Sequence, residues 1–156
     1  MMVAFQVRRA TAADTLAVTD LWIRARRTAM RAIPACVHGD GEVGEWTASI
    51  IIPRQPTWIT KTERRLTGMM SLDDGWVDQL YVDPDWRDQG IGSMLIRLAK
   101  ECYPQGLQLW TFESNISARR FYERYGFVAM ERTDGPAQRG RLPRHTLSVD
   151  SGDGPP

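Results

Sequence analysis

The sequence has little of what marks secreted, membrane-spanning or disulfide-stabilised proteins. Cysteine occurs only twice in 156 residues, at Cys36 and Cys102, which is too few for a disulfide framework. No apolar run is long enough to cross a bilayer, and the first residues lack the apolar segment of a signal peptide. Because Cys102 also falls on the apolar face of a predicted helix, we expect free, buried thiols in a cytoplasmic protein without a membrane partner.

An excess of charge of either sign is also missing. Lysine and arginine number 20, and aspartate and glutamate number 19, which gives a net charge of +1. We therefore expect no nucleic acid as a partner. Cys36 and His38 are close in sequence, but no further ligand cluster accompanies them, so no metal site is expected. A homodimer is left open as the assembly state.

The composition that is present is typical of one globular domain. Apolar residues make up 42% of the chain and charged residues 25%. A chain of 156 residues is also long enough to bury a substantial core. We expect a single domain over residues 1–150 and a disordered tail at residues 151–156.

Two glycines stand where a helix is predicted to begin. Residues 82–102 read VDPDWRDQGIGSMLIRLAKEC, and their apolar members recur at helical spacing from Ile91 onward. The first-turn N–H groups of a helix have no partner within the helix and lie at its positive end. Without Cβ atoms at Gly90 and Gly92, phosphates can approach this backbone closely. The same glycines also fit a plain tight turn, because neither a P-loop nor GxGxxG is present.

A second stretch reads as a strand followed by a helix. Residues 109–127 are LWTFESNISARRFYERYGF, in which the first four residues favour a strand. Ser114 or Asn115 can cap the helix, and Gly126 can end it. One face of this helix carries Ala118, Phe121, Tyr122 and Tyr125.

These two stretches together resemble the GCN5-related N-acetyltransferase (GNAT) superfamily. The motifs are R-x-x-G-x-G at residues 87–92 and N-x-x-A-x-x-F-Y-x-x-x-G-F at residues 115–127, within a resemblance that spans about residues 5–130. The resemblance implies transfer of the acetyl group of acetyl-CoA to a primary amine of a small molecule, by direct attack in a ternary complex. Acetylation of a protein N-terminus or lysine is one alternative. A non-catalytic acyl-CoA-binding sensor is the other.

The rest of the chain predicts the α/β (α+β) architecture of that family, a mixed twisted sheet with helices on both faces. A helix follows Thr11, residues 33–44 are predicted as a loop, and a short helix at 45–52 is stopped by Pro53. The strands that precede the helices at 90–102 and 116–125 are expected to be parallel neighbours. Strands are predicted at 5–8, 57–62, 66–72, 76–82, 107–112, 127–132 and 145–149.

The resemblance also implies a set of residues that contact acetyl-CoA. Backbone N–H groups of the glycine loop are expected to bind the pyrophosphate, with Arg87 as a positive charge beside it. The strand before the loop is expected to hydrogen-bond the pantetheine arm, and Asn115 either bonds that arm or only caps its helix. The full set is Leu80, Tyr81, Val82, Arg87, Asp88, Gln89, Gly90, Ile91, Gly92, Ser93, Asn115 and Tyr122.

Three residues are candidates for proton transfer. Tyr122 is the candidate acid that protonates the departing thiolate, and its alternative is a tyrosine that only packs in the core. Asp78 is the candidate base. Alternation along its strand places it inward with Leu80 and Val82, and an acidic side chain among apolar residues is unusual unless it has a functional or structural role. A hydrogen-bonded acid at the end of a strand is the other interpretation of Asp78. Glu113, at the end of the next strand, is the alternative base.

Overall fold

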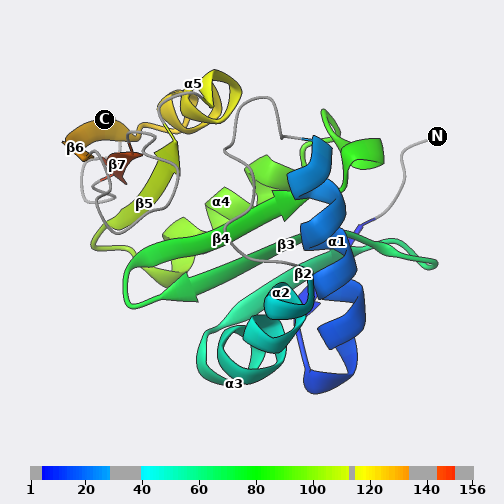
Figure 1. Ribbon diagram of the computed structural model, residues 1–156. Coiled ribbons are helices and arrows are strands. Elements are labelled where there is room, and N and C mark those ends of the chain that lie inside the picture. The colour runs from blue at the N-terminus through cyan, green and yellow to red at the C-terminus, as the bar shows by residue number, and fades with distance from the viewer. Residues whose placement is uncertain (1–4, 29–39, 113–114, 134–143, 150–156) are drawn as a thin grey trace.

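The computed structural model describes residues 5–28, 40–112, 115–133 and 144–149 of the chain. Within these residues, seven strands form one mixed sheet in the order β1-β2-β3-β4-β5-β7-β6 (Figure 1). The strands are β1 (Gln6–Arg9), β2 (Thr57–Lys61), β3 (Leu66–Asp73), β4 (Trp76–Val82), β5 (Leu107–Phe112), β6 (Val128–Thr133) and β7 (Arg144–Val149).

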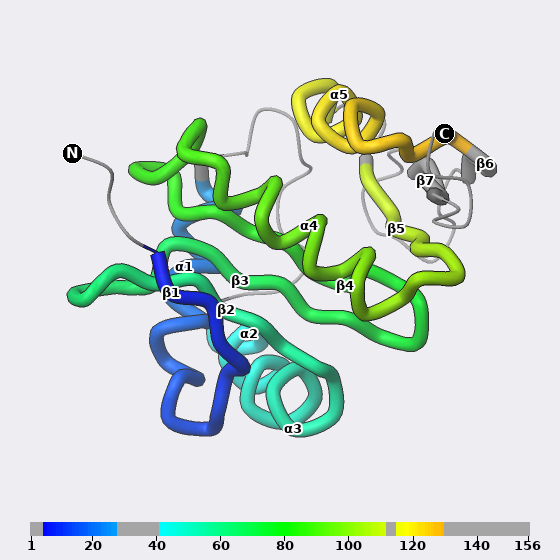
Figure 2. The backbone as a smooth tube through the Cα atoms, turned by 180° about the vertical axis from the view of Figure 1, so that it is seen from behind, coloured from blue at the N-terminus to red at the C-terminus, as the bar shows by residue number. Residues whose placement is uncertain are grey.

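Helices cover both faces of the sheet, as predicted. On one face lie α1 (Thr15–Thr28), α2 (Asp40–Trp46) and α3 (Ile52–Arg54), and on the other lie α4 (Ile91–Cys102) and α5 (Ile116–Arg124) (Figures 1 and 2). The strands β4 and β5 are parallel neighbours, and β7 completes the sheet between β5 and β6. Within the described part of the chain, no helix combines the length and hydrophobicity that a membrane span requires.

The sheet separates two hydrophobic cores. Met69 and Met70 are adjacent in β3 and fully buried, and each belongs to a different core. Because successive side chains of a strand point to opposite faces, the middle of the sheet is covered on both sides. Leu21 of α1 packs in one core, and Leu95 of α4 packs in the other. These cores hold the central strands in place beneath the helices.

Two predictions for the segment before β2 are wrong. The glycines of residues 33–44 predict a loop, yet α2 begins at Asp40 and contains two of them. A Cβ at Gly44 would meet Thr19 Cγ2 at 3.6 Å, an ordinary van der Waals distance, so this glycine lies beside α1 and not in a turn. Pro53 does not stop the helix either. It lies in the first turn of α3, after the π-helical turn η2 (Thr47–Ile51), where its missing N–H is tolerated.

The thiol of Cys102 is exposed, so the prediction that it is buried is wrong. Cys102 is the last residue of α4 and follows the last buried residue of that helix, Ala99, by about one turn. The helix therefore extends beyond the core that it covers. Cys36 and His38 lie outside the described residues.

The pairing of β4 with both of its neighbours changes near Asp78. The register between β3 and β4 shifts between Ser71 and Leu72, so Asp78 has no opposite residue in β3. On its other side, β4 pairs with β5 only at Trp76 and Val77. Asp78 is therefore an extra residue in β4 relative to β3, and an extra residue of this kind bends a strand and increases its twist. Beyond Val77, β4 and β5 part, and that edge of β4 has no strand partner among the described residues.

A buried carboxylate holds the segment between β4 and α4. Asp83, whose side chain is 1% exposed, pairs with Arg24 of α1 at 2.9 Å and with Arg65 of the β2–β3 turn at 2.5 Å. It also accepts a 2.9 Å hydrogen bond from the Asp85 N–H, which caps the short 3-10 turn η3 (Pro84–Trp86). Burial raises the pKa of Asp83, but the Asp85 N–H and the two guanidinium groups outweigh burial and lower the pKa.

We expect Asp83→Asn to destabilise the fold by about 2 kcal/mol at neutral pH, because the amide keeps the capping oxygen and loses both ion pairs. The two arginines are about 40% exposed, which places the loss below that of a fully buried pair. Urea denaturation of the variant and the parent chain measures the difference. The matched control is Asp85→Asn, which removes an exposed carboxylate 3.8 Å from the same Arg65 and should change stability by less than about 0.5 kcal/mol.

The loss should also depend on pH. Because the folded state lowers the pKa of Asp83, its stabilisation is fully present above the unfolded pKa of about 3.9 and is lost as pH falls through the folded value. The difference between the parent chain and Asp83→Asn should therefore shrink below about pH 4. An equal loss at pH 3 and pH 7 would contradict an ionised Asp83.

Candidate active site

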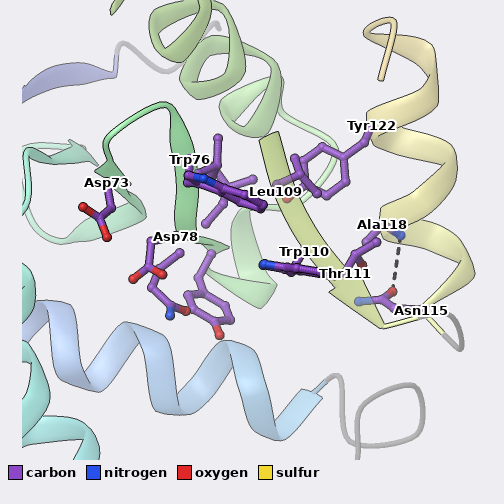
Figure 3. Close-up of a pocket in the computed structure, with 13 residues that line it drawn as sticks. Asp73, Trp76, Asp78, Leu109, Trp110, Thr111, Asn115, Ala118 and Tyr122 are labelled. Atoms are coloured by element: carbon purple, nitrogen blue, oxygen red, sulfur yellow. Dashed lines mark hydrogen bonds between the residues drawn. The ribbon is translucent and has the colours of Figure 1, made fainter. Parts of the chain in front are cut away.

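A pocket of about 490 Å³ lies where β4 and β5 part (Figure 3). Its walls come from β4, from β5, from the end of β3 and from α5 with its N-cap Asn115. The pocket passes between the two strands, so one end meets the α1 face of the sheet and the other meets α5. Asp78 lines the first end and Tyr122 the second.

Asp78 lies on the α1 side of the strands and is exposed to the pocket. The prediction that it points inward with Leu80 and Val82 is wrong, since those two residues pack into the core beneath α4. The register shift at Asp78 reverses the alternation of the strand, so Val77 and Leu80 share that core instead. A pattern of simple alternation could not anticipate this change.

The pKa of Asp78 is raised although the residue is exposed. The main cause is desolvation of the carboxylate group by the surrounding protein atoms, even though part of the residue is exposed to solvent. The nearby charge of Asp73 raises the pKa further. Hydrogen bonds from the side chains of Gln55 and Gln79 act in the opposite sense and hold the carboxylate in place. A carboxylate with a raised pKa takes up a proton more readily than an ordinary surface acid does.

Tyr122 reaches the pocket from α5. The residue is 8% exposed, and its ring packs against Phe121 and Phe127, with ring centroids 5.2 Å and 5.5 Å away. Burial raises the pKa of Tyr122 well above its usual value, and the nearby Tyr81 adds to the shift. Its hydroxyl therefore keeps its proton at neutral pH and can donate it. The sequence places Tyr122 on the inward face of α5 together with Ala118, and both residues line the pocket.

The far end of β4 leads into the glycine loop. Gly90 caps α4 with a φ of +82°, a left-handed conformation that glycine adopts without steric cost. A Cβ at this position would meet nothing within 4 Å. The loop therefore leaves open space beside the first-turn N–H groups of α4, which have no acceptor within the helix. Binding of an anion at this loop stays a prediction.

The second glycine of the motif has a different use. A Cβ at Gly92 would lie 3.1 Å from Cζ of Phe121, so this glycine lets α5 pack closely against α4. The space beside the backbone is therefore open at Gly90 and limited by the ring of Phe121 at Gly92. The neighbouring side chains also serve the fold: Ile91 is 1% exposed, and Ser93 Oγ accepts a hydrogen bond from the hydroxyl of Tyr125.

The remaining predicted residues divide between the two ends of β4. Leu80, Tyr81 and Asn115 line the pocket, and Asn115 Oδ1 also accepts a 3.3 Å hydrogen bond from the Ala118 N–H as the cap of α5. Val82 packs against the core, and the side chains of residues 87–89 are exposed in the glycine loop. Glu113, the alternative base, lies outside the described residues.

Sequence reasoning missed several residues of the pocket. Trp76 and Trp110 line it and stack on each other, with ring centroids 5.7 Å apart and an angle of 15° between the planes. Asp73 also lines it, at the end of β3. Alternation along each strand could have indicated the tryptophans. Trp76 precedes the buried Val77 and Trp110 follows the buried Leu109, so each tryptophan points to the other face of the sheet. Their meeting depends on the register between β4 and β5.

The pocket can support proton transfer at both of its ends. A protonated hydroxyl enters from one face of the sheet and a carboxylate from the other, with a strand edge between them. Such a pair fits a reaction in which one reactant loses a proton and a leaving group gains one. No group of three or more possible metal ligands occurs within the described residues.

Comparisons with known proteins find relatives among the N-acetyltransferases. Residues 53–129 match the model of the acetyltransferase (GNAT) domain family. The chain is 36% identical over 91 residues to the peptidyl-lysine N-acetyltransferase YjaB of Salmonella typhimurium, and 33% identical over 84 residues to that of Escherichia coli K12. These matches cover 58% and 53% of this chain, and 62% and 56% of the relatives' own lengths.

Solved structures share the whole fold. The apo-form solution structure of YjaB from Escherichia coli has a TM-score of 0.77 at 24% identity, covering 94% of this chain and 98% of that one. The structure of yncA from Salmonella typhimurium with its cofactor acetyl-CoA has a TM-score of 0.70 at 19% identity, covering 98% and 97%. By this family match, residues 53–129 are an acetyltransferase (GNAT) domain, and the described chain has the fold of these solved structures.

Proposed function

We propose that this protein transfers the acetyl group of acetyl-CoA to a primary aliphatic amine, by direct attack of the amine. The observation that carries the proposal is the pocket between the parted strands, with Tyr122 at one end and Asp78 at the other. The names of the curated relatives, which are N-acetyltransferases, support it.

The glycine loop is the proposed site of the donor's pyrophosphate. The open space at Gly90 fits an anion, and the first-turn N–H groups of α4 supply donors with a favourable dipole. Arg87, exposed in the same loop, supplies a positive charge. The pantetheine arm then follows the unpaired edge of β4 at Leu80–Val82, toward the pocket. When bound, acetyl-CoA supplies an activated acetyl group and a thiolate that leaves.

Tyr122 and Asp78 have complementary roles in the proposal. An amine acceptor arrives as an ammonium ion and must lose a proton before it can attack, and Asp78 accepts that proton on the α1 side. The leaving sulfur gains a proton, and the buried, neutral hydroxyl of Tyr122 donates it from the α5 side. Gln55 and Gln79 position the base. Glu113 remains the alternative base.

Two classes of acceptor fit this site. A protein lysine is supported by the names of the curated relatives, and a small-molecule amine is the acceptor expected from the sequence. A steady-state assay of thiol release, with lysine peptides and free alkylamines at matched concentrations, compares their kcat/KM values. A cytoplasmic location and a homodimer remain predictions.

We predict that acetyl-CoA stabilises the protein and that Gly90→Glu abolishes this effect. Binding at a hundredfold excess over Kd should contribute about 2.7 kcal/mol to stability, measured as a rise in Tm. The glutamate puts bulk and negative charge into the open space beside α4. The matched control is Gly75→Glu, because Gly75 has a φ of +84° and the same open surroundings in the β3–β4 turn. Both variants should lose similar intrinsic stability, and an unchanged acetyl-CoA shift in Gly90→Glu would rule out the pyrophosphate assignment.

We expect Tyr122→Phe to lower kcat about a hundredfold while leaving the fold and acetyl-CoA affinity nearly intact. The variant keeps the ring that packs against Phe121 and Phe127 and removes only the hydroxyl. The loss should shrink with an acyl donor whose thiol is more acidic, because that thiolate needs protonation less. Tyr125→Phe is the control, since its hydroxyl bonds Ser93 instead of lining the pocket. Equal kcat in Tyr122→Phe and the parent would return Tyr122 to a packing role.

We expect Asp78→Asn to lower kcat/KM and to change the acidic limb of its pH profile, without changing acetyl-CoA affinity. The base acts only when ionised, so activity is lost as pH falls through its raised pKa, and the asparagine variant lacks that transition. Asp74→Asn, an exposed neighbour in the β3–β4 turn, is the control. If Asp78→Asn is silent and Glu113→Gln changes the profile instead, the base is Glu113.

A further inference from the structure

An aromatic pair forms the outer wall of the pocket. Trp76 and Trp110 lie on the α1 face of β4 and β5, with nearly parallel rings (Figure 3). Trp110 is 40% exposed although one of its faces is covered by Trp76. Its exposed area therefore lies at its other face or its edge. An exposed indole that lines a pocket can contact a ligand through its face or its edge.

Two carboxylates accompany these rings. Asp78 lies beside the gap between the strands, and Asp73 lies further out, opposite Trp76 in the register of the β3–β4 hairpin. They are close enough for the charge of Asp73 to raise the pKa of Asp78. Among the described residues that line the pocket, there is no lysine, arginine or histidine. The pocket therefore holds two negative charges and two indoles, and an indole face attracts cations.

We propose that Asp73, Trp76 and Trp110 form a subsite for a second positive charge on the acceptor, separate from the amine that reacts at Asp78. The inference rests on the proposed function and specifies its acceptor, an amine with another cationic group one short alkyl chain away. One carboxylate takes the proton of the reacting amine, and the other pairs with the distal cation over the indole of Trp110. A diamine and a lysine next to a basic residue in a polypeptide share this chemistry.

The test compares three amines that have the same reacting group and nearly the same length. They are 1,5-diaminopentane, 5-amino-1-pentanol and 6-aminohexanoate, whose distal groups are positive, neutral and negative. We expect kcat/KM to fall about tenfold from the diamine to the amino alcohol, and further to the amino acid. Calorimetry measures the Kd of each amine independently of acetyl transfer and should give the same order. The differences should also decrease at high salt, because the subsite is exposed.

Variants test which residues produce the preference for the diamine over the amino alcohol. Asp73→Asn and Trp110→Ala should bring the kcat/KM and Kd ratios of diamine to amino alcohol close to one. Trp110→Phe, which keeps an aromatic face, should retain part of the ratio. The matched controls are Asp74→Asn in the same turn and Trp46→Ala on α2, where Trp46 is 49% exposed. Neither residue is among the described residues that line the pocket.

A second set of substrates tests whether the distal positive charge can come from a polypeptide as well as from a diamine. It consists of peptides in which arginine, serine or glutamate follows the reacting lysine, and a charge preference in either set supports the subsite. The inference is overturned if Kd and kcat/KM are insensitive to the distal charge in both sets, or if both pocket variants keep the full preference. A charge preference in Kd without any acetyl transfer supports the subsite and refutes the proposed function, so the two failures are distinguishable.

Discussion

The separation of β4 from β5 after only two paired residues is the constraint on which the rest of the site depends. Paired strands would bury both backbone edges and close the sheet between α1 and α5. Because the strands part, a pocket passes through the sheet, and residues from both faces line it. The extra residue in β4 at Asp78 occurs at the same point, so that carboxylate faces the pocket on the α1 side.

An open sheet must be supported elsewhere, and the ends of β4 supply that support. At one end, Asp83 joins α1, the β2–β3 turn and the η3 turn through two arginines and a backbone N–H. These contacts hold the segment that leads into the glycine loop. At the other end, where β4 and β5 are paired, Trp76 of β4 stacks on Trp110 of β5. Gly92 lets α5 pack on α4, which positions the ring of Tyr122.

Local patterns predicted most of the fold. The helices α4 and α5 and the strands β2 to β5 follow from apolar spacing, capping residues and turn chemistry, and these signals act over a few residues. The position of Tyr122 was predictable for the same reason, since it shares one helix face with Ala118 and Phe121. The open approach at Gly90 was likewise predicted from its place at the start of a helix. Where local chemistry decides the conformation, the sequence is sufficient.

The sequence by itself therefore determined most of the elements, their order, the helix face that carries Tyr122, and the place of the glycine loop at the start of α4. Only the tertiary structure decided what long-range packing controls. Asp78 lies away from the core face because the register against β3 shifts by one residue, and Gly44 lies in a helix beside α1 and not in a loop. The meeting of Trp76 with Trp110 depends on how β4 pairs with β5. Each of these outcomes depends on contacts between segments far apart in the chain, which no local pattern records.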